Sequence, residues 1–250
     1  MSAPDTTEAA GSPAEPPARP TARTMTVIAV VLTFASGASD VASFTRLGNV
    51  FTSVMTGNIT MFGLSLARGS ASLAAHTGVA VAGYVAGVVV STRIGWHFTG
   101  KRSQGQGTNA PGGHWPAHMN VTLLAEIALL GGVITGWELT GSNPAGAAQF
   151  IILAVAACAM GTQSAAVNQM GLGNVSTTFL TGTLTGLVSA LTRPDTRPAG
   201  LRRPGVLLGL LAGAVLAGVF LATAPAVVPL LPLAAVSTAV ALGSGLLKLR

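Results

Sequence analysis

The chain has 250 residues, of which 50% are apolar and only 8% are charged, and its mean hydropathy is +0.62. Soluble domains carry about 25% charged residues, so this composition excludes a water-soluble globular protein and predicts an integral membrane protein. The thirteen basic residues outnumber the seven acidic ones. Because the bases lie at the ends of apolar runs rather than on a solvated face, no nucleic-acid partner is expected.

The first 24 residues are rich in Pro, Ala, Ser and Thr, which predicts a disordered tail over 1–24. A single membrane domain is expected over 25–250. Arg19 and Arg23 would form the cytoplasmic flank of its first helix. Because further apolar runs follow the first one, that run is not expected to be a secretory signal.

Eight apolar segments follow the tail, and most are long enough to cross about 30 Å of hydrocarbon as a helix. None shows the alternation of a strand, and a helix satisfies its own backbone in lipid. The expected fold is therefore an all-α membrane bundle with the lipid bilayer as its surroundings. The segments lie near 25–45, 48–67, 71–92, 119–140, 146–170, 174–192, 205–224 and 226–247.

An internal repeat relates the two halves of the chain. Residues 47–60 and 172–185 share eight identities without a gap, at an offset of 125. Farther on, Gly83 and Gly87 match Gly209 and Gly213 once a single residue is inserted. The sequence therefore predicts two related halves, at about 25–140 and 146–248.

Two arrangements of these halves stay open. If all eight segments span, the halves are parallel, with nine bases on the cytoplasmic side and four outside. If segments 48–67 and 174–192 instead enter and leave on one side, six spans remain, the repeat is inverted and the split is eleven to two. The positive-inside rule favours the second arrangement, which is a recurring transporter design. In both, the termini are cytoplasmic and the membrane is the bacterial inner membrane.

The repeated phrase carries hydroxyl and amide side chains. On one continuous helix the first set would lie within an arc of about 80°, and so would the second. Such a stripe lines a polar path or substrate cavity, or else it holds packed helices together; both interpretations stay open. The candidate residues are Asn49, Thr52, Thr56, Gly57 and Asn58, with Thr60, in the first copy, and Asn174, Thr177, Thr181 and Gly182, with Thr185, in the second.

Only two carboxylates, Asp40 and Glu126, lie deep in apolar segments. An Asp at mid-bilayer costs about 2.5–3.5 kcal/mol, so both should face the protein interior. Each is a candidate for cation binding, proton relay or substrate contact; the alternative is a bond to a neighbouring helix. Ser36, Ser39 and Ser43 would share a helix face with Asp40, and Arg46 is within reach of it.

Gln163 and Asn168 lie in the second-half segment that corresponds to the helix of Asp40, and Ala165 aligns with Asp40 itself. They complete the candidate pathway, with a packing role as the alternative for Gln163. The spacing of Gly205, Gly209 and Gly213 predicts close helix packing and offers a face for a homo-oligomer.

No cofactor or metal is expected, and the protein is not expected to be an enzyme. His76, His97, His114 and His118 are too far apart for a metal site, and the one cysteine, Cys158, excludes a Cys-based zinc site. The chain has no P-loop and no HExxH motif.

These motifs together resemble the YoaK-like family of uncharacterised bacterial multi-pass membrane proteins. The matching elements are Asp40, the stretch Met55 to Asn58, Glu126, the stretch Met160 to Gln163 and the stretch Thr181 to Leu184. The chain departs from the family pattern at Val41 and Ser164. The resemblance implies a membrane protein of about this architecture and brings no biochemical role with it.

Two functions are compatible with these observations. The first is binding or transport of a small solute, coupled to protons or cations through Asp40 or Glu126. The second is a membrane scaffold or assembly partner that transports nothing.

Overall fold

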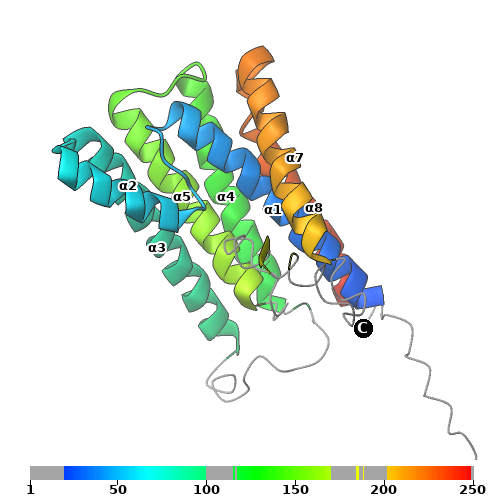
Figure 1. Ribbon diagram of the computed structural model, residues 1–250. Helices are drawn as coiled ribbons and strands as arrows, with labels where there is room; N and C mark the ends of the chain where they lie inside the picture. The colour runs from blue at the N-terminus through cyan, green and yellow to red at the C-terminus, as the bar shows by residue number, and fades with distance from the viewer. Residues whose placement is uncertain are drawn as a thin grey trace, which may run out of the picture.

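The computed structural model of the protein is a bundle of helices (Figure 1). It describes residues 20–99, 115, 117–169, 184–185, 188 and 202–248. The helices are α1 (Pro20–Arg46), α2 (Met55–Arg68), α3 (Ala71–Thr99), α4 (Ala117–Leu139), α5 (Gly146–Gln169), α7 (Arg202–Thr223), the 3-10 helix η3 (Pro225–Val227) and α8 (Leu230–Lys248).

Six of the described segments are long and apolar enough to cross a membrane. Each of the six corresponds to an expected segment, and the bounds agree to within a few residues, apart from longer ends on α1 and α3. Of the other two expected segments, 48–67 is not a span, and 174–192 lies outside the described residues apart from 184, 185 and 188. The tail was expected to reach residue 24, but α1 already begins at Pro20. The spans are Arg23–Arg46, Ala71–His97, His118–Leu139, Gly146–Gln169, Pro204–Thr223 and Pro225–Gly245.

One end of the bundle, here called the Arg46 end, joins α1, α3 and α5. Gln149 Nε2 donates to the Arg46 carbonyl (2.9 Å), and His76 Nε2 lies 3.0 Å from Gln149 Oε1. Trp137, close to the end of α4, donates from Nε1 to the Pro225 carbonyl (3.0 Å). The connection between α7 and α8 therefore lies at this end too.

The opposite end, here called the His118 end, gathers the other termini of the same helices. His118 Nε2 lies 2.8 Å from Gln169 Oε1, which joins the start of α4 to the end of α5. Asn120 Nδ2 donates to Ser244 Oγ (3.0 Å), close to the end of α8. The six long helices therefore alternate in direction, and α1 begins at the end where α8 finishes (Figure 1).

The helix α2 is different, because it enters and leaves the bundle at the Arg46 end. Its 14 residues reach about 21 Å at 1.5 Å per residue, too short to cross about 30 Å of hydrocarbon. Its last turn leads within two residues into α3, and α2 packs along α3. The expected segment 48–67 is therefore a re-entrant segment made of the loop 47–54 and a short helix.

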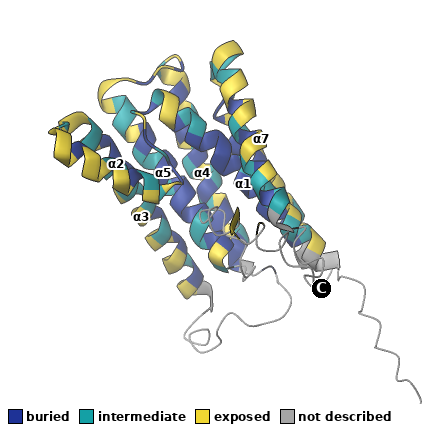
Figure 2. Cartoon of the chain, in the orientation of Figure 1, coloured by how far each residue is buried: buried dark blue, intermediate teal, exposed yellow. Residues whose placement is uncertain are grey.

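The centre of the bundle is formed by α1 and α5. These two helices bury a larger share of their membrane windows than the other described spans (Figure 2). α7 packs along α1 and α3 packs along α5; α8 also contacts α1, and α4 contacts α5. Each central helix is thus flanked by two outer helices, in the same pattern.

Glycines allow the closest of these contacts. A Cβ on Gly37 of α1 would collide with the Leu210 carbonyl of α7, and a Cβ on Gly213 of α7 would collide with the Phe34 carbonyl of α1. The pair α5 and α3 repeats this arrangement, with Gly161 against Tyr84 and Gly87 against Cys158. In the sequence, Gly161 and Cys158 of α5 follow Gly37 and Phe34 of α1 by 124 residues. Gly213 and Leu210 of α7 follow Gly87 and Tyr84 of α3 by 126 residues.

The glycine face of α7 has the packing role that its spacing predicts, since Gly209 and Gly213 lie against the backbone of α1. The face is covered by α1 of the same chain at Gly209 and Gly213, and a homo-oligomer through glycine faces stays a prediction.

Candidate functional site

The Asp40 carboxylate holds the loop that precedes α2. Its Oδ1 accepts hydrogen bonds from Thr52 N (2.9 Å), Thr52 Oγ1 (3.1 Å) and Ser53 N (2.8 Å), and its Oδ2 accepts one from Ser53 Oγ (2.5 Å). Asp40 is 7% exposed. Four donors replace the water that a buried carboxylate loses, and bonds to an ionised acceptor are stronger than neutral ones. Asp40 is therefore a clamp between α1 and the start of the re-entrant helix.

The chain reverses sharply between α1 and this clamp. Gly48 and Asn49 both have positive φ, 94° and 58°, which glycine and asparagine tolerate better than other residues. A Cβ on Gly48 would also collide with the ring of His76. Asp40 lies six residues before Arg46, so the loop returns about 9 Å along α1 into the bundle.

Asn58 fastens the same loop from the other side. Its Oδ1 accepts from Phe51 N (3.0 Å) and its Nδ2 donates to the Phe51 carbonyl (2.6 Å). The side chain is fully buried. The backbone N–H and C=O of Phe51 thus both bond to the Asn58 side-chain amide. The loop needs such a partner because its backbone makes no regular helix or sheet hydrogen bonds there.

Replacing Asn58 by Ala should lower the stability of the folded protein by about 2 kcal/mol, because two backbone groups lose their partner. The measurement is the thermal melting of the purified full-length chain. The control is Thr60→Ala on the same helix, which removes an exposed hydroxyl bonded only to the Thr56 carbonyl. Equal melting temperatures for the two variants would contradict the assigned role of Asn58.

The predicted hydroxyl stripe of the first copy is wrong, because helix α2 begins only at Met55. Asn49 and Thr52 lie in the preceding loop. Asn49 is exposed, whereas Thr52 is buried and donates its hydroxyl to Asp40 Oδ1. Thr56 and Thr60 lie on α2 and are exposed. A Cβ on Gly57 would make only ordinary contacts.

The expectation that Ser43 lies beside Asp40 on α1 is confirmed, whereas the expectation that Arg46 reaches toward its carboxylate is wrong. Ser43 shares its helix face but donates to the Asp40 backbone carbonyl (3.1 Å) and not to the carboxylate. Arg46 turns to the Asn143 side chain instead, with Nη1 2.9 Å from Oδ1. The Asp40 partners come from the loop, which a helical projection of α1 leaves out.

Glu126 and Gln163 face the middle of the bundle, whereas Asn168 is exposed. Gln163 Nε2 donates to the Leu32 carbonyl (3.0 Å) and to Ser36 Oγ (2.9 Å), which joins α5 to α1. Gln163 Oε1 and both carboxylate oxygens of Glu126 are buried and have no hydrogen-bond partner among the described residues. Asn174, Thr177, Thr181 and Gly182 lie outside the described residues.

Sequence reasoning missed the polar group that closes the Arg46 end. His76 is 7% exposed, with Nδ1 2.7 Å from the Ser72 carbonyl, Nε2 on Gln149 and its ring stacked on Phe150 at 4.2 Å. The spacing of His76 from the other histidines speaks only against a metal site and predicts no other role for it. Its position one turn into α3, with Gln149 at the same depth of α5, is visible in the sequence only if the antiparallel pairing of these helices is known.

The chain matches the family described as Protein of unknown function (DUF1275) over residues 28–243. It belongs to that family. The UPF0700 transmembrane protein YoaK of Bacillus subtilis (strain 168) is 28% identical over 158 residues, which are 63% of this chain and 63% of the relative. The alignment thus spans less than two thirds of that protein's length. No solved structure matches the chain.

The comparisons agree with the membrane architecture of this DUF1275 protein, since the relative is itself named a transmembrane protein. They carry no substrate. Among the described residues, no group of three His, Cys, Asp or Glu side chains could hold a metal ion. Evidence on function must therefore come from the polar groups inside the bundle.

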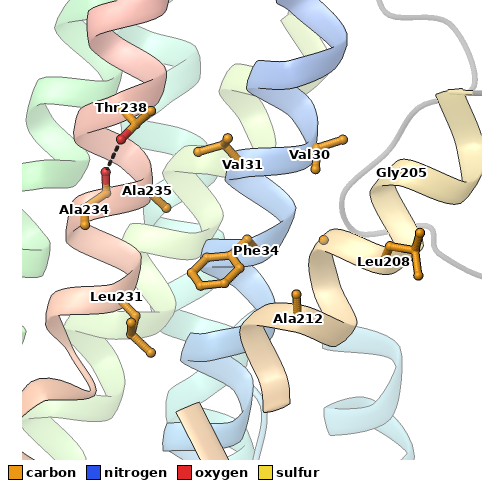
Figure 3. Close-up of a pocket in the computed structure, with 11 residues that line it drawn as sticks. Val30, Val31, Phe34, Gly205, Leu208, Ala212, Leu231, Ala234, Ala235 and Thr238 are labelled. Atoms are coloured by element: carbon orange, nitrogen blue, oxygen red, sulfur yellow. Dashed lines mark hydrogen bonds between the residues drawn. The ribbon is translucent and has the colours of Figure 1, made fainter. Parts of the chain in front are cut away.

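A cavity of about 660 Å³ opens between α1, α7 and α8 of the DUF1275 chain (Figure 3). Its one side-chain polar group, the hydroxyl of Thr238, donates to the Ala234 carbonyl (2.8 Å) of the same helix. The remaining lining comes from Val30, Val31, Phe34, Gly205, Leu208, Gly209, Ala212, Leu231, Ala234 and Ala235. Such a lining suits hydrocarbon and offers a polar solute only the acceptor capacity of the Thr238 hydroxyl.

Proposed function

We propose that this protein binds and transports a small polar solute across the cytoplasmic membrane, with its two halves arranged as an inverted repeat. The observation that carries the proposal is a set of three buried polar residues, here called the central cluster: Ser36, Gln163, which bonds to it, and Glu126. They lie within a bundle whose described part has six candidate spans and a re-entrant helix. In inverted-repeat transporters the substrate site lies near the midplane, where the halves meet.

The reciprocal glycine contacts support the inverted repeat. Helix α1 relates to α7 as α5 relates to α3, with the same glycine roles in both pairs. Because the six helices alternate in direction, α1 and α5 run in opposite directions, as an inverted repeat requires. Matching the glycines pairs Asp40 with Ser164 rather than with Ala165, one residue away from the ungapped alignment.

The basic residues support an orientation with both termini in the cytoplasm. The Arg46 end carries Arg46 and Arg68. The His118 end has Arg23 near the start of α1, Arg93 near the end of α3, and Arg202, Arg203 and Lys248 at helix termini. An excess of Lys and Arg marks the cytoplasmic side.

The central cluster also limits the class of solute. Its unpartnered groups are oxygen acceptors, so a ligand that they bind must donate hydrogen bonds or carry positive charge. Small amides, amines and ammonium have this chemistry. We propose no catalytic role for Asp40 or Glu126.

The test is stopped-flow light scattering of proteoliposomes that contain the full-length chain, challenged with ammonium, urea, formamide and glycerol. At least one solute should cross several-fold faster than in protein-free vesicles. The variant Gln163→Leu, which removes the central amide, should abolish the difference. The control Asn168→Leu changes an exposed amide of the same helix and should leave it intact.

The alternative is a scaffold that transports nothing, and two observations favour it. The large cavity of the described residues is apolar, and Asp40 has a clamping role. If no solute of the panel crosses faster than in protein-free vesicles, and none shifts the melting temperature of the purified protein, the scaffold is the better account.

A further inference from the structure

The buried carboxyl group of Glu126 lacks any donor. Both of its oxygens are inaccessible and have no hydrogen-bond partner among the described residues, and the residue is fully buried. An unpaired ionised carboxylate in such a place is very costly, whereas a protonated carboxyl can donate its own hydrogen. The site is therefore short of one hydrogen.

Gln163 Oε1 is the acceptor that lies at the same depth. The pair His118 and Gln169 sets the register of the antiparallel helices α4 and α5. Moving eight residues along α4, from His118 to Glu126, corresponds to moving eight residues back along α5, to Gly161. Gln163 is two residues away, about 3 Å along the axis.

The register is the same on the other side of Glu126, where a Cβ on Gly132 would contact Val155 at 3.8 Å. Both side chains also face the same core. Leu123 and Leu130 of α4 belong to one buried cluster together with Met160 and Ala166 of α5. These four residues lie one turn to either side of Glu126 and Gln163.

The orientation of the Gln163 amide is set by its bonds to α1. Its Nε2 donates to the Leu32 carbonyl and to Ser36 Oγ, which leaves Oε1 as the free acceptor. A proton on Glu126 would turn one of the unpartnered oxygens into a donor for Oε1. One hydrogen thus satisfies two of the three unpartnered atoms.

A narrow cavity lies on the Arg46 side of this site. Its volume is about 20 Å³, which is enough for about one water molecule. The lining includes Ser39 and Ser43 of α1, Leu130 and Trp137 of α4 and Pro229 beside α8. Leu130 is one turn from Glu126, and Ser36 is one turn from Ser39, so the hydroxyl groups of α1 continue from the cavity to Gln163.

Few other titratable groups are available to share this proton. On α1, both carboxylate oxygens of Asp40 accept bonds from the loop. On α5, the candidate is Cys158, which is half-buried. The described part of α8 from Leu230 to Gly245 has no titratable side chain, and on α4 His118 is bonded to Gln169 while Glu138 is exposed. On α3, His76 is bonded at the Arg46 end, and Arg93 and His97 are exposed near the His118 end.

We propose that Glu126 is a proton-binding residue, that its carboxyl group donates to Gln163 Oε1, and that the proton enters and leaves as water-borne H⁺ through the Ser39/Ser43 cavity. Binding forms the O–H bond of the carboxyl group, and release returns the proton to water at the Arg46 end. The inference deepens the proposed transport function and rests on it for its purpose, since the proton would be the coupling ion.

The test is infrared difference spectroscopy of the full-length protein in lipid, recorded between acid and alkaline pH. A carboxylic C=O stretching band should be present in the wild type, lost in Glu126→Gln and retained in Glu138→Gln, which changes an exposed carboxyl of the same helix. If Glu126→Gln fails to fold, Glu126→Asp should keep the band at a shifted position. A wild-type band unaffected by any change at Glu126 would overturn the proposal.

A second readout tests the path. Ser39→Leu fills the narrow cavity, so it should slow hydrogen–deuterium exchange of the Glu126 carboxyl group several-fold, as measured by the shift of its C=O band in D₂O. Unchanged exchange would overturn the assigned route. The two experiments distinguish the two proposals. Solute flux without a Glu126 band would refute only the proton site, and a Glu126 band without solute flux would refute only transport.

Discussion

Replacing Asp40 by Leu should destabilise the protein by about 4 kcal/mol, whereas Asp40→Asn should cost about 1–2 kcal/mol. Leucine leaves the Thr52 and Ser53 backbone N–H groups buried without an acceptor, at about 1–3 kcal/mol each. Asparagine can still accept from the amides through Oδ1 and donate to Ser53 Oγ, so it loses chiefly the charge assistance of the bonds. The measurement is the melting temperature and the yield of monodisperse full-length protein.

The two variants together separate a clamp from a proton relay. A clamp tolerates the neutral asparagine, so Asp40→Asn should keep a part of any solute flux measured in vesicles. A relay needs a titrating group and would lose the flux completely in a well-folded Asp40→Asn protein. That second outcome would contradict the role that the four hydrogen bonds of Asp40 indicate.

Valine at Gly213 or at Gly87 should prevent normal folding. In both places a Cβ would run into a backbone carbonyl, of Phe34 or of Cys158, and a backbone of a packed helix cannot move aside as a side chain does. We expect a loss at or above the upper end of the about 1–3 kcal/mol that overpacking costs in a core. The measurement is the yield of monodisperse protein and its melting temperature.

The matched control is Gly218→Val on the same helix α7, because a Cβ at Gly218 would meet nothing within 4 Å. It should behave like the wild type. Similar losses at Gly213 and Gly87 are also expected if the two halves use equivalent contacts. A well-folded Gly213→Val protein would contradict the close packing of α1 and α7.

The six spans could be predicted from the sequence, because the length and apolar character of a segment largely decide whether it crosses a bilayer. The start of α2 could not. The periodicity of residues 48–60 is compatible with a continuous helix, but the chain leaves the helical region at Gly48 and Asn49, and Asp40 then holds residues 52 and 53 in place. That break depends on a contact between residues twelve or more positions apart.

For the site residues too, the sequence predicts burial but not the contacts between distant parts of the chain. Burial of Glu126 and Gln163 could be anticipated from their cost in lipid. Their common depth could not, because it follows from the register of α4 against α5, which the His118–Gln169 pair reports. A helical projection of α1 shows only the neighbours of Asp40 on its own helix, whereas its hydrogen-bond partners, Thr52 and Ser53, lie on the loop. The sequence predicts a repeat, and the proposed inverted arrangement, which rests on the glycine contacts, would shift the alignment of α1 with α5 by one residue.

The central claim is that α2 re-enters, so that the described helices cross the membrane six times, and the proposed orientation then places the start of α3 on the outer side. It can be tested by labelling single cysteines with a membrane-impermeant maleimide in a Cys158→Ala background. Suitable sites are Ala71→Cys at the start of α3 and Gly245→Cys near the end of α8, both exposed. Ala71→Cys should be labelled in intact cells, and Gly245→Cys only after the cells are opened. Labelling of both positions from the same side would contradict the re-entrant helix and, with it, the inverted arrangement of the halves.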